Sequence, residues 1–125
     1  MTFEVGDSVE VHALHRMPVE GPEGELHGHD YRLDVVIARD ELDERGMVVD
    51  LEQLDAELKA VRAELDGRDL ELIRPAEAEG VTVEVLARWA WDRLAPLAVT
   101  SGAGELSVRV YESPAAFGGY RAPVP

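Results

Sequence analysis

The stretch from His27 to Ala38 constrains the fold more than any other part of the chain. It begins His-Gly-His and then alternates polar and apolar residues, as a β-strand with one buried face does. Because side chains two residues apart on a strand point to the same side, His27 and His29 share a face. Gly28 between them lets another backbone or a ligand come close. Two imidazoles on one face form half of a zinc site, for which His15 is the nearest further ligand.

Length and composition indicate one domain that works in a reducing compartment. The chain has 125 residues, of which 46% are hydrophobic, enough to bury a single core over residues 1–125. It has no cysteine, so only histidine and carboxylate side chains are available to hold a metal. The first residues do not resemble a secretory signal, and no apolar run approaches the roughly 20 residues of a membrane helix. We therefore expect a cytoplasmic protein without a membrane partner.

The charge of the chain argues against a nucleic-acid partner. Asp and Glu number 26 against 12 for Lys and Arg, which gives a formal net charge of −14 at pH 7. Such a charge repels a phosphate backbone unless the basic residues gather on one face, and the sequence shows no basic cluster. A general compositional bias toward acidic residues explains this charge without giving it a function.

Two strands are predicted in the first third of the chain. Apolar residues at odd positions predict a strand over 3–14, with a bulge or turn where Gly6-Asp7 interrupts the alternation. Proline and glycine predict a loop over 16–24, after which the second strand, about 26–38, returns beside the first.

This hairpin brings three histidines together. His15 ends the first strand, level with His27 and His29 at the start of the second. His12 lies an odd number of positions from His15, so it points to the opposite face. We therefore expect His12 to be dispensable for a metal site.

The middle of the chain predicts two helices. Asp50 is a good N-cap, with Gln53 at the capping-box spacing. Apolar residues then recur at intervals of three and four, and Asp66-Gly67 ends the pattern. Thr82 caps a second helix that runs until Pro96. The apolar stripe of the first helix comprises Leu51, Leu54, Leu58, Val61 and Leu65, and that of the second Val85, Leu86, Trp89, Ala90 and Leu94.

The rest of the chain predicts an irregular segment and two further strands. Residues 68–81 are irregular, alternation over 106–111 predicts a third strand, and a short fourth strand lies around 117–120. The proline-rich tail from Ala122 is expected to fray. In the second helix, Trp89 and Trp91 cannot both be fully buried by one stripe, so one of them lies at a rim or subunit contact.

Six short motifs, in this order along nearly the whole chain, resemble the 6-pyruvoyl tetrahydropterin synthase and 6-carboxytetrahydropterin synthase family. The most specific combination is a histidine, then His-Gly-His-x-Tyr on a strand, then a glutamate near the C-terminus. The motifs are Ala-Leu-His15-Arg-Met, Leu-His27-Gly-His29-Asp-Tyr31, Gly46-Met-Val-Val-Asp50-Leu, Leu65-Asp66, Thr82-Val-Glu84 and Val108-Arg-Val-Tyr-Glu112-Ser.

The resemblance implies an α+β tunnelling fold, with a four-stranded antiparallel sheet that carries two helices on one face. Three subunits would close a barrel and two barrels would stack, so self-association as a trimer or hexamer is expected, with sites between subunits. It also implies that His15, His27 and His29 hold Zn²⁺. A small-molecule pterin substrate would be gripped by Glu112, with Thr82 and Glu84 also in the substrate-binding set.

The chemistry of these residue types agrees with those roles. Three neutral imidazoles leave zinc one open position, as in catalytic rather than structural sites, and zinc there would act as a Lewis acid. A carboxylate such as Glu112 accepts two parallel N–H bonds from an amino-pyrimidinone edge. The alternative is that Glu112 is merely solvated and the histidines merely pack.

Two departures from the family pattern concern proton transfer. The family usually has a cysteine base four residues before His-Gly-His, where this chain has Glu23, and a histidine after Leu-Asp, where it has Gly67. Asp66 is thereby left without its partner. Either Glu23 or Glu25 could serve as the base, because general-base catalysis requires reach and a pKa near the working pH.

The sequence therefore predicts a zinc-dependent lyase that acts on dihydroneopterin triphosphate or a related dihydropterin. Three alternatives stay open. The first is a degenerate homologue that binds metal or pterin without turnover, and the second cleaves the side chain to a 6-hydroxymethyl pterin. The third is a zinc enzyme recruited to a non-pterin substrate.

Overall fold

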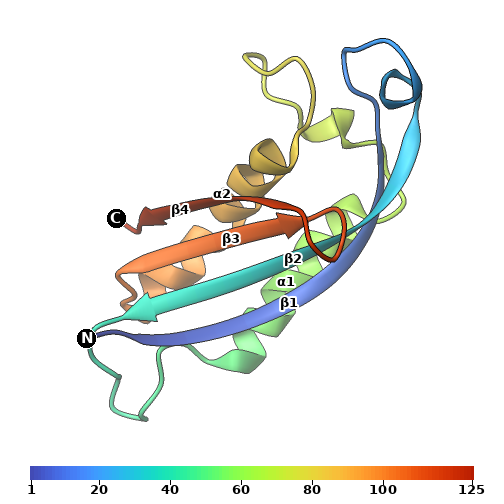
Figure 1. The fold of residues 1–125 in the computed structure, drawn as a ribbon. Helices are drawn as coiled ribbons and strands as arrows, with labels where there is room; N and C mark the ends of the chain where they lie inside the picture. The colour runs from blue at the N-terminus through green and yellow to red at the C-terminus, as the bar shows by residue number, and fades with distance from the viewer.

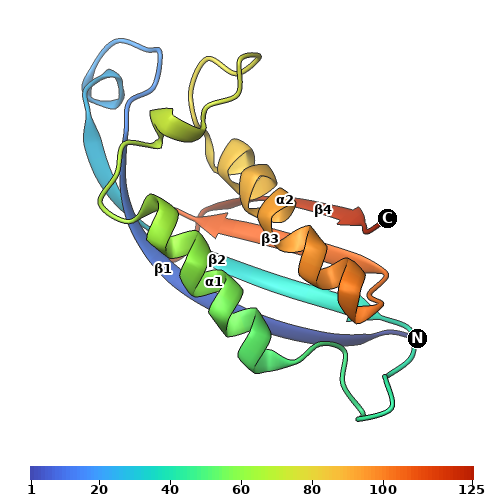
Figure 2. The ribbon, with the colours of Figure 1, turned by 180° about the vertical axis from the view of Figure 1, so that it is seen from behind.

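The computed structural model describes residues 1–125 and contains one four-stranded antiparallel sheet, in the order β1-β2-β3-β4. Two helices lie across one face of this sheet and leave the other face open (Figures 1 and 2). The predicted α+β fold class is thereby confirmed. No helix has the length and apolar character of a membrane span. The elements are β1 (Phe3–His15), η1 (Pro22–Gly24), β2 (His27–Arg39), α1 (Leu51–Leu65), η2 (Leu70–Ile73), α2 (Val83–Ser101), β3 (Glu105–Tyr111) and β4 (Phe117–Pro123).

The β1–β2 hairpin is longer than the rest of the sheet. Its register is unbroken from the Phe3–Arg39 pair to the His15–His27 pair, so the predicted bulge at Gly6 is wrong. Gly6 pairs with Val36 in this register, and a Cβ on Gly6 would lie only 3.2 Å from the Val35 carbonyl oxygen. β3 pairs with β2 only from Arg32 onward, so the histidine-bearing end of the hairpin projects beyond it (Figure 1).

One core joins the sheet to the helices. Every second residue from 31 to 37 on β2 and from 106 to 110 on β3 is buried, as the alternation predicted. The helices add apolar side chains to the same core, but the prediction that Leu51 lies on the buried stripe of α1 is wrong, because this first residue of the helix is 53% exposed. The fully buried side chains include Val11, Leu33, Val35, Ile37, Leu54, Leu58, Leu86, Leu94, Leu106 and Val108.

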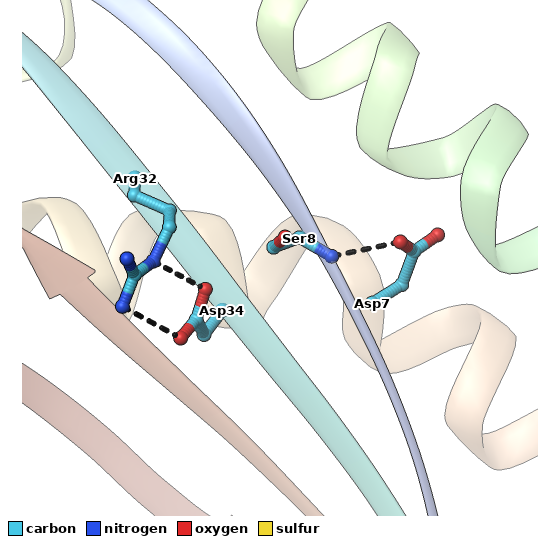
Figure 3. A network of polar contacts seen from close by, with 4 residues as sticks. All are labelled: Asp7, Ser8, Arg32 and Asp34. Carbon is cyan, nitrogen blue, oxygen red and sulfur yellow. Dashed lines mark hydrogen bonds and ion pairs between the residues drawn. The ribbon is translucent and has the colours of Figure 1, made fainter.

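The open face and outer edge of the hairpin are polar. On β2, Arg32 Nε lies 3.0 Å from Asp34 Oδ1 (Figure 3). The Arg32 guanidinium also stacks 4.1 Å from the Tyr111 ring centre. On β1, the Ser8 backbone N–H donates to the Asp7 carboxylate at 2.8 Å. Charged side chains on an edge strand discourage uncontrolled pairing with other sheets.

The first helix begins and ends where the sequence predicted. The Asp50 carboxylate accepts from the Glu52 backbone N–H at 2.9 Å, so Asp50 is the N-cap, although no side-chain bond from Gln53 completes a capping box. The helix ends at Leu65, and Gly67 then turns the chain with a φ of 75°. Glycine adopts this left-handed conformation without a steric penalty.

The second helix is longer than predicted, because it continues through Pro96 to Ser101. Leu94 and Ala98 on either side of the proline are fully buried, and this packing offsets the backbone hydrogen bond that proline cannot make. It ends at Gly102, which has a φ of 82°.

The buried stripe of α2 is also rotated relative to the prediction. Trp91 is buried and its Nε1–H donates to the Leu106 carbonyl at 2.8 Å, whereas Trp89 is half-buried beneath Arg93. Trp89 therefore packs at the margin of the stripe, and the prediction that one stripe cannot fully bury both tryptophans is confirmed. The C-terminal tail also differs, since Ala122 pairs with Leu106 as part of β4 rather than fraying.

Candidate metal centre

Three histidine side chains meet at the projecting end of the β1–β2 hairpin. His15 and His27 are directly opposed in the register, and His29 follows two residues later on the same face. Their ring centres lie 4.5 to 4.9 Å apart. The Nε2 atoms of all three rings are buried and have no hydrogen-bond partner. Three unpartnered polar atoms in one buried place are the arrangement expected of a site that could hold a metal ion.

Backbone carbonyls orient two of the rings. His15 Nδ1 lies 3.2 Å from the Val81 carbonyl oxygen, and His27 Nδ1 lies 2.7 Å from that of Glu25. A carbonyl oxygen only accepts hydrogen bonds, so Nδ1 must donate and therefore carries the proton. The neutral ring then presents a free lone pair at Nε2. Such outer contacts to a backbone carbonyl are typical of metal-binding histidines.

Burial also keeps His15 in the neutral form that binds metals. Removal from water lowers the pKa of His15, and the neighbouring His27 and His29 lower it further, against opposing contributions from the Val81 carbonyl and Glu23. A ring that resists protonation keeps its lone pair available near neutral pH.

Glu23 is the fourth potential ligand at this position. Its Oε2 lies 3.2 Å from His27 Nε2, and one ligand atom from each of the four residues lies within 4.8 Å of the others. The short η1 turn places it, because the Glu23 carbonyl accepts from the Met17 N–H at 2.7 Å. Gly24 makes this turn possible, since a Cβ there would lie 2.0 Å from the Val19 carbonyl oxygen. Imidazole nitrogen and carboxylate oxygen are zinc ligands, so the donor set fits this metal.

Tyr31 lies beside the histidines, and the charge of Glu112 acts on it. The buried Tyr31 ring is centred 5.4 Å from that of His29. Burial raises the pKa of Tyr31, and the charges of Glu112 and Glu23 raise it further, so the side chain stays a phenol. Glu112 itself is exposed, just beyond the end of β3. The sequence analysis assigned Tyr31 no role. The signal was present, because Tyr31 follows His29 by two residues on the same strand and therefore shares its face.

The other predicted acid-base residues have different contacts. The Glu25 side chain is exposed, and only its carbonyl touches the cluster, through His27. The Asp66 carboxylate accepts from the His12 backbone N–H at 3.0 Å, at the outer edge of β1. Asp66 is therefore not among the residues that this chain gathers around its histidines.

Thr82 and Glu84 lie at the start of α2. Thr82 Oγ1 accepts from the Val85 N–H at 3.2 Å and caps the helix, as predicted. Its neighbour Val81 provides the carbonyl for His15, a contact that no side-chain pattern reveals. Glu84 is exposed and faces β4, since a Cβ on Gly118 would lie 3.0 Å from its Oε1.

His12 lies apart from this cluster. It is exposed, and its Nδ1 lies 2.8 Å from Asp30 Oδ1. Its ring lies across Gly28, where a Cβ would come within 3.0 Å of His12 Cε1. The neighbour of this glycine is therefore the His12 side chain, whereas we expected another backbone or a ligand there.

Comparisons with known proteins agree with this arrangement. The sequence pattern of the family described as 6-pyruvoyl tetrahydropterin synthase matches residues 5–123. The 6-pyruvoyl tetrahydropterin synthase from Plasmodium vivax superposes with a TM-score of 0.82 at 16% identity, over 99% of each chain. That from Caenorhabditis elegans gives a TM-score of 0.76 at 22% identity, over 98% of this chain and 96% of the other. The chain belongs to the 6-pyruvoyl tetrahydropterin synthase family.

Proposed function

We propose that this protein is a zinc-dependent lyase that acts on dihydroneopterin triphosphate or a related dihydropterin. The observation that carries the proposal is the convergence of three buried Nε2 atoms, none with a hydrogen-bond partner, beside Glu23. Family membership supports a pterin substrate. His15, His27 and His29 would hold the zinc, which when bound supplies a Lewis acid that makes neighbouring C–H bonds of the substrate more acidic.

Glu23 is the better candidate for the general base. Its carboxylate reaches the histidine cluster, whereas the Glu25 side chain is exposed and absent from that cluster. Among the solved relatives is a P. vivax enzyme in which a glutamate called a catalytic residue has been changed to alanine. The Glu23 carboxylate would take a proton from the pterin side chain. Glu112 would accept the paired N–H groups of the pterin ring and fix its orientation.

The protein would work as a trimer or hexamer. The outer edge of β1 is covered only near His12 and Leu14, which bond to Gly67 and Arg68. β4 has no strand on its outer side. Pairing these edges between subunits would remove two open sheet edges, and the pterin would bind between subunits. Thr82 and Glu84 would then contribute to substrate binding from the start of α2.

A second candidate function is a homologue that binds metal and pterin without turnover. The observation that favours it is the Asp66 carboxylate, which already accepts from the His12 N–H and has Gly67 instead of a histidine beside it. Side-chain cleavage to a 6-hydroxymethyl pterin and a non-pterin substrate are further outcomes of the same test.

Product analysis of the zinc-loaded protein tests the proposal. The protein is incubated with dihydroneopterin triphosphate, and products are identified by chromatography and mass spectrometry. We expect a new pterin product, a turnover roughly 10²- to 10⁴-fold lower in Glu23→Gln, and unchanged turnover in Glu25→Gln. Pterin binding without any product supports the non-catalytic homologue, and no pterin binding rejects the proposed substrate.

A further inference from the structure

The contact between Glu23 and His27 cannot be an ordinary hydrogen bond. The two atoms are 3.2 Å apart, yet His27 Nε2 has no hydrogen-bond partner, so the carboxylate lies off the direction in which an N–H would point. His27 Nδ1 already donates to the Glu25 carbonyl at 2.7 Å. In a neutral ring, Nε2 then carries a lone pair and no proton, and it lies 3.2 Å from the negative carboxylate without a hydrogen between the two atoms.

A carboxylate oxygen and an unprotonated imidazole nitrogen both carry full or partial negative charge, so at this distance they repel each other unless a cation lies between them. A proton on His27 is a poor candidate, because it would lack hydrogen-bond geometry toward Glu23 and would stand beside the lone pairs of His15 and His29. A single metal ion satisfies all four groups at once. Three imidazole nitrogens and one carboxylate oxygen complete a four-coordinate zinc site.

We propose that Glu23 is the fourth ligand of the resting metal centre and that substrate must displace it. This inference rests on the proposed zinc site and goes beyond the role of Glu23 as a base. While one Glu23 oxygen is coordinated, the cation would withdraw charge from the carboxylate and make it a weaker base. Displacement by an incoming substrate oxygen would release the carboxylate beside the substrate, so the base would gain its full strength only when the site is filled.

The position of Glu23 suits such a movement. Its side chain is 63% exposed, whereas the three Nε2 atoms are buried. Its backbone is held by the η1 turn, through the Met17 N–H and the tight packing at Gly24. A mobile carboxylate on a fixed backbone can leave the metal without rebuilding the histidine ligands.

Metal affinity is the first test. Dissociation constants for Zn²⁺ are measured by chelator competition in the full-length wild type, Glu23→Gln and Glu25→Gln. Glu25→Gln removes the same charge two residues away while keeping the backbone carbonyl that orients His27. We expect at least about tenfold weaker binding in Glu23→Gln, since even outer-shell partners of metal ligands contribute 10- to 100-fold, and little change in Glu25→Gln. Equal affinities in all three proteins would overturn the proposal.

A neutral probe separates coordination from simple charge attraction. Imidazole is titrated into the Co²⁺-substituted proteins and followed by visible absorption. If Glu23 occupies the fourth position, imidazole binds more tightly to Glu23→Gln than to the wild type, because no carboxylate has to leave. If Glu23 acts only by its charge, the neutral probe binds both proteins equally, and the proposal is wrong. Neither readout needs turnover, so a failed pterin assay would leave this result intact, and equal imidazole binding would leave the lyase function standing.

Discussion

His12 and His15 lie three residues apart on the same strand, yet their surroundings differ in every respect that matters for function. His12 is exposed and bonded to Asp30, whereas His15 is buried with an unpartnered Nε2 that faces two other rings. The strand period accounts for the separation, because an odd spacing sends the two side chains to opposite faces. A buried Nε2 atom without a hydrogen-bond partner, rather than the presence of histidine, distinguishes the candidate metal ligand from the surface residue.

Replacing single histidines should produce the largest difference between the two faces. His27→Ala or His29→Ala removes one of three imidazoles, and we expect loss of metal binding by more than about 100-fold, above the 10- to 100-fold cost of an outer-shell change. His12→Ala should bind metal as the wild type does, because its ring lies on the other face. Metal content after dialysis, measured by mass spectrometry, distinguishes the variants. Full occupancy in the His27→Ala, His29→Ala double variant would contradict the site.

The two ends of β3 provide the next comparison. Glu112 follows its histidine-proximal end, whereas Glu105 begins the strand beside Arg121. We expect Glu112→Ala to weaken pterin binding by about 1 to 3 kcal/mol, because buried N–H groups of the ring would lose their acceptor. Calorimetry with a dihydropterin measures the effect. Glu105→Ala is the control and should bind normally, so equal losses in both variants would argue against an anchoring role for Glu112.

The stability of the metal-free protein should depend on pH through His15. Its pKa is lowered on folding, so the unfolded chain binds a proton more readily than the folded chain. The free energy of unfolding should therefore fall as pH drops below the unfolded value of about 6.5. Urea unfolding of the chelator-treated protein at pH 8 and pH 5.5 measures this fall. His15→Gln should reduce the pH dependence, and an identical slope in that variant would assign it to other groups.

The smallest effect is expected at Gly28, which lies between the two faces. A Cβ there would meet the tip of the His12 ring at 3.0 Å, and this flexible side chain can move aside. We expect Gly28→Ala to release the His12–Asp30 contact, visible as a shifted His12 resonance in NMR spectra, with metal affinity nearly unchanged. A large loss of metal would show that the two faces are coupled.

The sequence predicted the parts of this molecule that depend on short-range periodicity. Alternation over β2 placed His27 and His29 on one face, and the caps at Asp50 and Thr82 marked both helix starts. Long-range packing explains the main errors. Helix α2 continues through Pro96 because Leu94 and Ala98, on either side of the proline, are buried in the core. Gly6 keeps the strand register because it pairs with Val36 on β2.

In the candidate site too, sequence patterns predicted some residues, whereas contacts made by the folded backbone could not be predicted. The family pattern identified three histidines and Glu23, which the structure brings together. The carbonyls of Val81 and Glu25, which orient His15 and His27, belong to the backbone and leave no trace in side-chain patterns. Asp66 was grouped with the catalytic residues by motif alone, and its catalytic role stays a prediction; the structure shows its carboxylate bonded to the backbone N–H of His12.

Anomalous diffraction at the zinc absorption edge tests the central claim most directly. Crystals of the wild-type protein grown with zinc should show one strong peak per chain, between the Nε2 atoms of His15, His27 and His29. Density from this peak to the Glu23 carboxylate is expected in the substrate-free protein. The absence of a peak at the three histidines, or a peak beside His12 and Asp30 instead, would contradict the assignment of the metal centre.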